Sequence, residues 1–274
     1  MSKRQHSARY SGSRKQTGKG SAASGKPGRP TPSAAPDRVM LYGFHAVEAA
    51  LRNDSRRLYQ LSATARAAER LASLLNTRGL APTLVSAADL TRRLGEGTVH
   101  QGLLLEAAPL HTVALEDLAP ASPLIVLDQV TDPHNVGAIL RTAAAYGAGA
   151  VIGQDRHAPA PSGALAKAAT GALEHVPYLQ VTNISRALEQ LKRDGYWIIG
   201  LDGDGPATIE ESVGRRPVAL VLGAEGAGLR RLTQERCDLL ARLDLPGPIK
   251  TLNVSNAAAI ALYAVHRTNM SISE

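Results

Sequence analysis

The stretch VLGAEGAGL at residues 221–229 poses the first question about chemistry, because glycine-rich loops after buried strands often hold phosphates. Its glycine spacing, G-x-x-G-x-G, matches neither the dinucleotide-binding fingerprint nor the phosphate loop of nucleotide hydrolases. Glu225 would also repel an anionic phosphate. The sequence therefore argues against a phosphate site. The three glycines allow either a tight turn or close approach of the backbone to another ligand, and both interpretations stay open.

Two further loops gather polar residues next to helices. In TDPHNVGAILR, residues 131–141, Asn135 is expected to cap a helix that carries Arg141 in its second turn. Burying an arginine among apolar neighbours is costly without an anion, so Arg141 is expected to meet either a ligand or a nearby carboxylate. In the other loop, Thr251, Asn253 and Ser255 precede an Ala-rich helix, where capping and ligand binding are compatible.

The segments around these loops have the pattern of a parallel sheet covered by helices. Apolar runs begin at residues 123, 148, 196 and 218, a shorter run covers 241–245, and helical segments alternate with them. We expect these helices around 136–146, 162–175 and 184–193, after 228, and from 254. Ligands of such sheets bind beyond the carboxyl ends of the strands, so the site is expected in the loops after Leu127, Leu222 and Leu245.

The first half of the chain is expected to contain a smaller α/β unit. Helices are predicted at 43–53 and 66–79, the second ended by Gly79, and strands at 56–63 and 100–110. A polar segment with several prolines follows. The predicted division is therefore a tail at 1–37, a domain at 38–110, a linker at 111–122 and a second domain at 123–270.

The predicted tail is strongly basic. Residues 1–36 hold eight Lys or Arg and no Asp or Glu, which accounts for the net charge of +7 of the whole chain. The segment has no Leu, Ile, Val, Phe or Trp, so it is expected to be disordered. Its charge suits a polyanion, most often a nucleic acid. A solubilising tail and an organelle transit peptide are the alternatives.

The composition also excludes several classes of protein. The single cysteine, Cys237, excludes a disulfide framework and a cysteine-based metal site, and it suits a reducing cytosol. No apolar run approaches the length of a membrane span. We therefore expect a cytoplasmic protein that neither binds a metal nor crosses a membrane.

Together, the three loops resemble the motifs of the SpoU/TrmH family of the SPOUT superfamily, whose members methylate RNA ribose 2'-hydroxyls with S-adenosyl-L-methionine. The segments YGFHAVEAAL and VHQGLLLEA resemble the family's substrate-binding domain, and are most similar to the branch that methylates a guanosine in the P-loop of 23S ribosomal RNA. The motif positions are Asn135, Gly137 and Arg141 in the first stretch, Gly223, Glu225, Gly226, Gly228 and Leu229 in the second, and Leu252, Asn253, Val254 and Ser255 in the third.

This resemblance implies an α/β fold whose C-terminal parallel-sheet domain contains a deep trefoil knot, and a homodimer with its RNA site near the dimer interface. It implies that S-adenosyl-L-methionine binds at Leu222, Gly223, Leu243, Leu252 and Ser255. It makes Arg141 the catalytic residue, assisted by Asn135, Glu225, Thr251 and Asn253. Glu225 would either orient Arg141 or accept hydrogen bonds that stabilise the knot.

The sequence departs from the family pattern at two places, and several other functions stay open. Leu243, Asp244 and Leu245 replace the usual Ile-Pro-Met, and Thr251 replaces a serine. Transfer RNA methylation, antibiotic-resistance methylation of ribosomal RNA and a non-catalytic role in ribosome assembly are the alternatives. A nicotinamide oxidoreductase is disfavoured, because the G-x-G-x-x-G fingerprint is absent from the start of the second domain.

Overall fold

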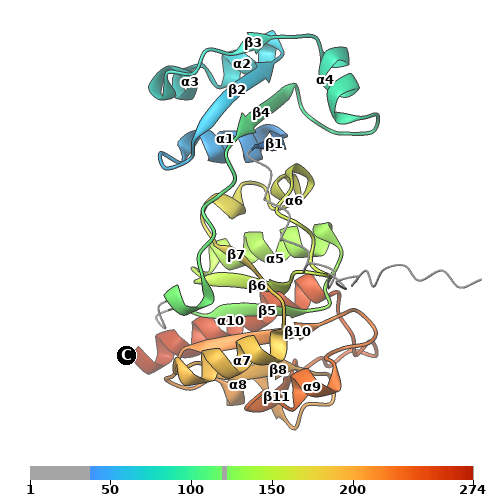
Figure 1. Ribbon diagram of the computed structural model, residues 1–274. Helices are drawn as coiled ribbons and strands as arrows, with labels where there is room; N and C mark the ends of the chain where they lie inside the picture. Colours follow the sequence, from blue (N-terminus) through green and yellow to red (C-terminus); the bar gives the residue numbers. More distant parts are fainter. Residues whose placement is uncertain (1–37, 119–121, 274) are drawn as a thin grey trace, which may run out of the picture. The chain divides into compact units, whose positions relative to one another are not determined.

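The computed structural model describes residues 38–118 and 122–273, with side chains given as far as residue 270 (Figure 1). The tail predicted at 1–37 and part of the predicted linker lie outside these residues. The described residues form two sheets, one in an N-terminal region (residues 38–110) and one in a C-terminal region (residues 122–273). Both regions belong to one compact unit of the chain.

The sheet of the N-terminal region has the strand order β1-β4-β2-β3. β4 pairs antiparallel with β1 and β2, and β2 pairs parallel with β3. The strands are β1 (Val39–Tyr42), β2 (Leu58–Ala63), β3 (Thr83–Leu84) and β4 (Leu103–Ala107). The helices are α1 (Phe44–Arg52), α2 (Ala65–Arg70), α3 (Ala72–Arg78) and α4 (Ala87–Leu94).

The sheet of the C-terminal region has the order β7-β6-β5-β10-β8-β11-β9, and every strand pair in it is parallel. The prediction of a parallel sheet is thus confirmed, and the apolar run at its centre becomes the fully buried strand β5. The strands are β5 (Leu124–Asp128), β6 (Ala150–Gln154), β7 (Tyr178–Val181), β8 (Trp197–Leu201), β9 (Ala207–Thr208), β10 (Val218–Gly223) and β11 (Leu239–Arg242).

Helices cover both faces of this sheet. Leu124 and Val126 of β5 belong to the apolar cluster that contains α7, whereas Ile125 and Leu127 pack in the cluster that contains α5 and α10. The helices are α5 (Pro133–Ala145), α6 (Gly163–Ala168), α7 (Ile184–Arg193), α8 (Ile209–Ser212), α9 (Arg231–Gln234) and α10 (Val254–Ser273), with short 3-10 helices η1 (Leu115–Asp117) and η2 (Ala172–Glu174). The core of the C-terminal region is therefore two layers of side chains around one buried sheet.

Three local predictions about helices are wrong in detail. The helix expected at 66–79 is divided at Leu71, although it ends at Gly79 as predicted. The helix expected around 162–175 is broken at Thr170 and Gly171, which both have positive φ angles. Asn135 does not cap α5, because the Asp132 carboxylate accepts from the His134 N–H at 2.9 Å and Pro133 occupies the first turn.

The two regions pack closely against each other through small residues. A Cβ at Gly163 of α6 would lie 2.0 Å from the carbonyl oxygen of Met40 in β1. A Cβ at Gly171 would lie 2.5 Å from that of Ala49 in α1. Buried side chains from both regions accordingly form one continuous apolar cluster. Glycine at these positions is what allows the backbones to approach so closely.

Candidate functional site

Three polar side chains from loops far apart in sequence meet at the carboxyl edge of the second sheet. The Oε1 atom of Glu225 accepts from Asn135 Nδ2 at 3.0 Å and from Asn253 Nδ2 at 2.5 Å. Asn253 Nδ2 also donates to Asn135 Oδ1 at 3.0 Å. The structure thus brings together three of the residues that the sequence singled out, one from each loop.

Ser255 holds Asn253 in this cluster from the first turn of α10. Its hydroxyl and its backbone N–H both donate to Asn253 Oδ1, at 2.6 and 2.9 Å. The carbonyl end of the Asn253 amide is therefore occupied, and the NH₂ end is left to face Glu225. Capping of the helix and construction of the site use the same side chain.

The glycine-rich loop makes a tight turn after β10. Gly228 N–H donates to the carbonyl of Ala224 at 2.9 Å, and Gly226 and Gly228 have φ angles of 79° and 65°. A Cβ at Gly223 would lie 2.1 Å from the carbonyl carbon of Gly228. Gly223 therefore has no room for a side chain, while the positive φ angles of Gly226 and Gly228 favour glycine, and the backbone of this turn lines the neighbouring cavity.

That cavity has a volume of about 530 Å³, within the range of small-molecule sites. It lies between the loops that follow β8, β10 and β11. Four of the five predicted cofactor-binding residues line it, whereas Ser255 does not. Thr251 and Glu225 line it too. Its walls include Leu201, Asp202, Gly203, Asp204, Leu222, Gly223, Gly226, Gly228, Gln234, Leu243, Leu245, Lys250, Leu252 and Val254.

The unusual Asp244 does not enter the cavity. Leu243 and Leu245, on either side of it, line the wall, while Asp244 is exposed. The replacement of the family's proline therefore leaves the lining apolar at this point.

Arg141 lies on the exposed side of α5. Within residues 38–118 and 122–273, it has neither a hydrogen bond nor an ion pair. The expectation that it sits among apolar neighbours is wrong, because Ile139 and Leu140 turn inward and Arg141 turns outward. The carboxylate partner that the sequence left open is also not found among the described residues, and Glu225 bonds to the two asparagines instead. The guanidinium is free to bind an anion from outside the chain.

Sequence reasoning missed two parts of this edge. Asp128, fully buried at the end of β5, accepts from the backbone N–H of Arg230 at 3.1 Å and from its Nε at 2.7 Å, which fastens the segment after the glycine loop to the sheet. The loop after β8 supplies Asp202, whose carboxylate accepts from Gln234 at 3.1 Å. The position of Asp202 directly after a buried strand could have indicated it. Because β8 lies parallel beside β10, the loop after β8 reaches the same edge of the sheet as the glycine loop.

Cys237 does not line this cavity. Burial raises the pKa of the Cys237 thiol to about 12, and the thiol donates to the carbonyl of Thr233 at 3.3 Å. A protonated thiol is a poor nucleophile. The part of the chain that the structure describes contains no group of side chains arranged to hold a metal ion. Nor does any of its helices have the length and apolar character needed to span a membrane.

A parallel α/β sheet with a ligand-sized cavity at its carboxyl edge is typical of the class of proteins that bind a small molecule there. The SpoU rRNA Methylase family matches residues 122–263, and the RNA 2'-O ribose methyltransferase substrate-binding family matches residues 40–113. The chain therefore belongs to the SpoU rRNA methylase family and is an RNA 2'-O-methyltransferase.

Individual relatives support this membership. The 23S rRNA (guanosine-2'-O-)-methyltransferase RlmB of Pseudomonas aeruginosa is 40% identical over 237 residues, which cover 83% of this chain and 95% of that protein. An uncharacterised tRNA/rRNA methyltransferase of Synechocystis is also 40% identical, and the match spans 62% of its length. The crystal structure of an AdoMet-bound rRNA methyltransferase from Sinorhizobium meliloti shares the fold, with a TM-score of 0.70, 24% identity, and coverage of 84% of this chain and 87% of that one.

Proposed function

We propose that this protein transfers a methyl group from S-adenosyl-L-methionine to the 2'-hydroxyl of a guanosine in the P-loop of 23S ribosomal RNA, in the cytosol. The observation that carries the proposal is the cavity of about 530 Å³ beside the cluster of Asn135, Glu225 and Asn253. The choice of RNA rests on relatives such as the Pseudomonas aeruginosa RlmB, whose name specifies a guanosine of 23S rRNA.

The residues present fit S-adenosyl-L-methionine. An adenine ring needs an apolar slot with a few polar partners, and the cavity offers leucine side chains next to exposed main-chain groups. We assign Leu222, Gly223, Leu243 and Leu252 to the cofactor's walls, with the Thr251 hydroxyl nearby. When bound, the cofactor supplies an electrophilic sulfonium methyl. The chain itself supplies the shape that holds the methyl toward RNA.

Arg141 is assigned to the RNA. Its guanidinium is exposed and has no partner among the described residues, so a phosphate can engage it through two parallel hydrogen bonds. Its cationic guanidinium polarises the ribose hydroxyl, and a phosphate oxygen or water takes the proton. Asn135 and Asn253, oriented through Glu225, align the reacting groups.

The proposal also includes a trefoil knot in the C-terminal region and a homodimer. The trefoil knot rests on the resemblance to the family, and the hydrogen bond of 2.5 Å between Glu225 and Asn253 places the glycine loop beside the start of the last helix. A homodimer is supported by the exposed apolar residues of α10, where Ile260, Tyr263 and Met270 are 41%, 52% and 48% exposed. A molar mass from light scattering equal to one chain would contradict the dimer.

Methyl transfer is tested with tritium-labelled S-adenosyl-L-methionine and ribosomal RNA. We expect label in 23S RNA, and mapping of 2'-O-methyl groups in cells that lack the protein should show one guanosine missing its methyl group. Label in transfer RNA alone would move the protein to that branch of the family. Absence of label in any RNA would favour a non-catalytic role in ribosome assembly.

A further inference from the structure

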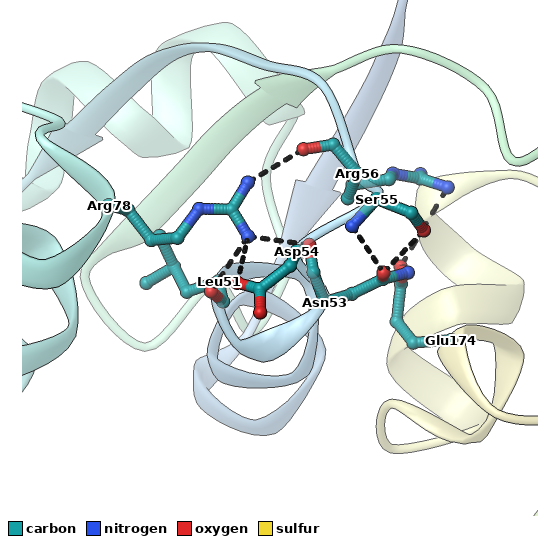
Figure 2. Close-up of polar contacts among 7 residues, drawn as sticks. All are labelled: Leu51, Asn53, Asp54, Ser55, Arg56, Arg78 and Glu174. Atoms are coloured by element: carbon teal, nitrogen blue, oxygen red, sulfur yellow. Dashed lines mark hydrogen bonds and ion pairs between the residues drawn. The ribbon is translucent and has the colours of Figure 1, made fainter.

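A buried carboxylate joins the two regions of the chain (Figure 2). Glu174, the last residue of η2, accepts from Asn53 Nδ2 at 2.7 Å and lies 3.8 Å from Arg56 Nη1. Asn53 and Arg56 belong to the N-terminal region, whereas Glu174 belongs to the C-terminal region. The side chains of Arg56 and Glu174 are each 4% exposed, so this contact is removed from solvent.

The loop that meets Glu174 is also held by hydrogen bonds within its own region. Arg78, at the end of α3, donates to the carbonyl oxygens of Leu51, Asn53 and Arg56 at 3.3, 2.5 and 2.8 Å. Asn53 Oδ1 also accepts from the hydroxyl of Ser55 at 2.7 Å. Figure 2 shows Arg78 contacting this loop from the side opposite Glu174. The N-terminal region therefore meets Glu174 with a loop whose backbone carbonyls are tied to Arg78.

This contact is poorly suited to stabilising the fold. Arg56 Nε and Nη1 are buried without a hydrogen-bond partner, and desolvation lowers the pKa of Arg56 even though Glu174 opposes that change. Buried ion pairs with unsatisfied groups are often no more stabilising than apolar side chains of the same volume. A misaligned docking that kept the two groups buried but apart would be penalised, because a lone buried charge is costly. The pair thus selects one docking geometry.

The docking geometry matters to the site through α5. η2 packs directly against α5, the helix that carries Asn135 and Arg141. The break at Thr170 and Gly171 turns the chain so that η2 faces α1 on its other side. A short, packed path therefore connects the N-terminal region to the helix of the candidate catalytic arginine.

We propose that Glu174 is a positioning residue for methyl transfer, which fixes the N-terminal region on the C-terminal region so that RNA held by the first delivers its ribose to Arg141 and the cavity in the second. The inference rests on the proposed function, since it requires RNA bound to the N-terminal region. Misplacement of reacting groups by about 1 Å can cost on the order of 100-fold in rate, so loss of this contact acts on turnover.

The first test compares Glu174→Gln with Glu210→Gln, an exposed carboxylate of α8, as control. For Glu174→Gln we expect kcat for RNA methylation to fall at least tenfold, while the dissociation constants for S-adenosyl-L-methionine and for RNA stay within twofold. A merely structural residue would change binding and turnover together. A kcat within twofold of the control overturns the inference.

The second test measures docking directly and does not require activity. Spin labels are placed at Ser73→Cys on α3 and Arg186→Cys on α7, both exposed, in a Cys237→Ala background, and their distance distribution is recorded by electron paramagnetic resonance. We expect one narrow distribution that broadens in Glu174→Gln. An unchanged distribution overturns the inference. If the unaltered enzyme methylates no RNA, the proposed function fails, and this measurement still decides whether Glu174 fixes the docking.

A double variant, Arg56→Met with Glu174→Met, guards against simple unfolding, because it leaves neither charge buried alone. We expect it to melt near the unaltered protein and yet to show the broadened distance distribution and the reduced kcat. Unaltered turnover in this variant would mean that apolar packing suffices for docking, and would overturn the inference.

Discussion

Replacing Arg141 is expected to lower turnover without changing cofactor binding or folding, because of where the residue lies. It is exposed, has no partner among the described residues, and does not line the cavity. We therefore expect Arg141→Ala to change the free energy of unfolding by no more than about 0.5 kcal/mol, as for other exposed positions. We expect S-adenosyl-L-methionine affinity to be unchanged and kcat to fall on the order of 100-fold or more. Calorimetric binding and tritium transfer measure the two effects, and unchanged methylation would refute the assignment.

Cys237 gives a second prediction at this scale, concerning pH. Burial raises its pKa from an ordinary 9.0 to about 12, so above pH 9 the unfolded chain loses a proton that the folded chain keeps. The unfolded state then binds fewer protons, and stability falls as pH rises from 9 toward 12, by at most about 1.4 kcal/mol per pH unit. Urea unfolding of the unaltered protein and of Cys237→Ala isolates this contribution. Equal pH dependence of the two proteins would contradict it.

The role of Glu225 could be predicted only in part from the sequence. Its charge argued against a phosphate loop, and the resemblance left it either as a partner of Arg141 or as an acceptor. Its hydrogen bonds are with Asn135 and Asn253, from segments 90 and 28 residues away. No local pattern specifies a contact at such separations. Proximity of the carboxyl ends of parallel strands was the physical reason to expect these loops together.

At the scale of elements, the central buried strands were predictable, whereas β1, β3, β7, β9 and the helix interruptions were not. Buried parallel strands require continuous apolar runs, which are visible in sequence. By contrast, the helix expected around 162–175 breaks where Gly171 lies against Ala49 of the other region, a contact without any local signature. The cap of α5 was assigned to Asn135 instead of Asp132, since both residue types cap helices well.

The contact between α6 and β1 gives a prediction at the same scale. A Cβ at Gly163 would lie 2.0 Å from the Met40 carbonyl oxygen, which is backbone and cannot move aside cheaply. We expect Gly163→Ala to reduce the free energy of unfolding by about 1–3 kcal/mol, as overpacking does. Gly214→Ala is the matched control, because a Cβ there meets nothing within 4 Å. Equal urea midpoints for the two variants would show that the junction is looser than described.

At the scale of the whole molecule, the most basic segment and the candidate site lie in different parts of the chain. Eight of the Lys and Arg residues lie in residues 1–36, which contain no acid, whereas the cavity and its polar cluster lie after residue 200 apart from Asn135. Aromatic residues make up only 3% of the chain, so few side chains are available to stack on single-stranded bases. Contacts with phosphates are the remaining source of RNA affinity, and these depend on salt.

Deleting residues 1–36 should therefore change RNA binding and leave cofactor binding unchanged. Each lost phosphate contact lowers the slope of log affinity against log salt concentration by roughly 0.7–0.9, so a tail that engages RNA must leave a measurable difference in that slope. We expect weaker RNA binding and a shallower slope for the truncated protein, with S-adenosyl-L-methionine affinity unchanged because the cavity is built from residues 201–257. Filter binding of ribosomal RNA between about 50 and 200 mM salt measures the slope. An identical slope for the two proteins would reduce the basic segment to a solubilising role and assign RNA recognition to the N-terminal region.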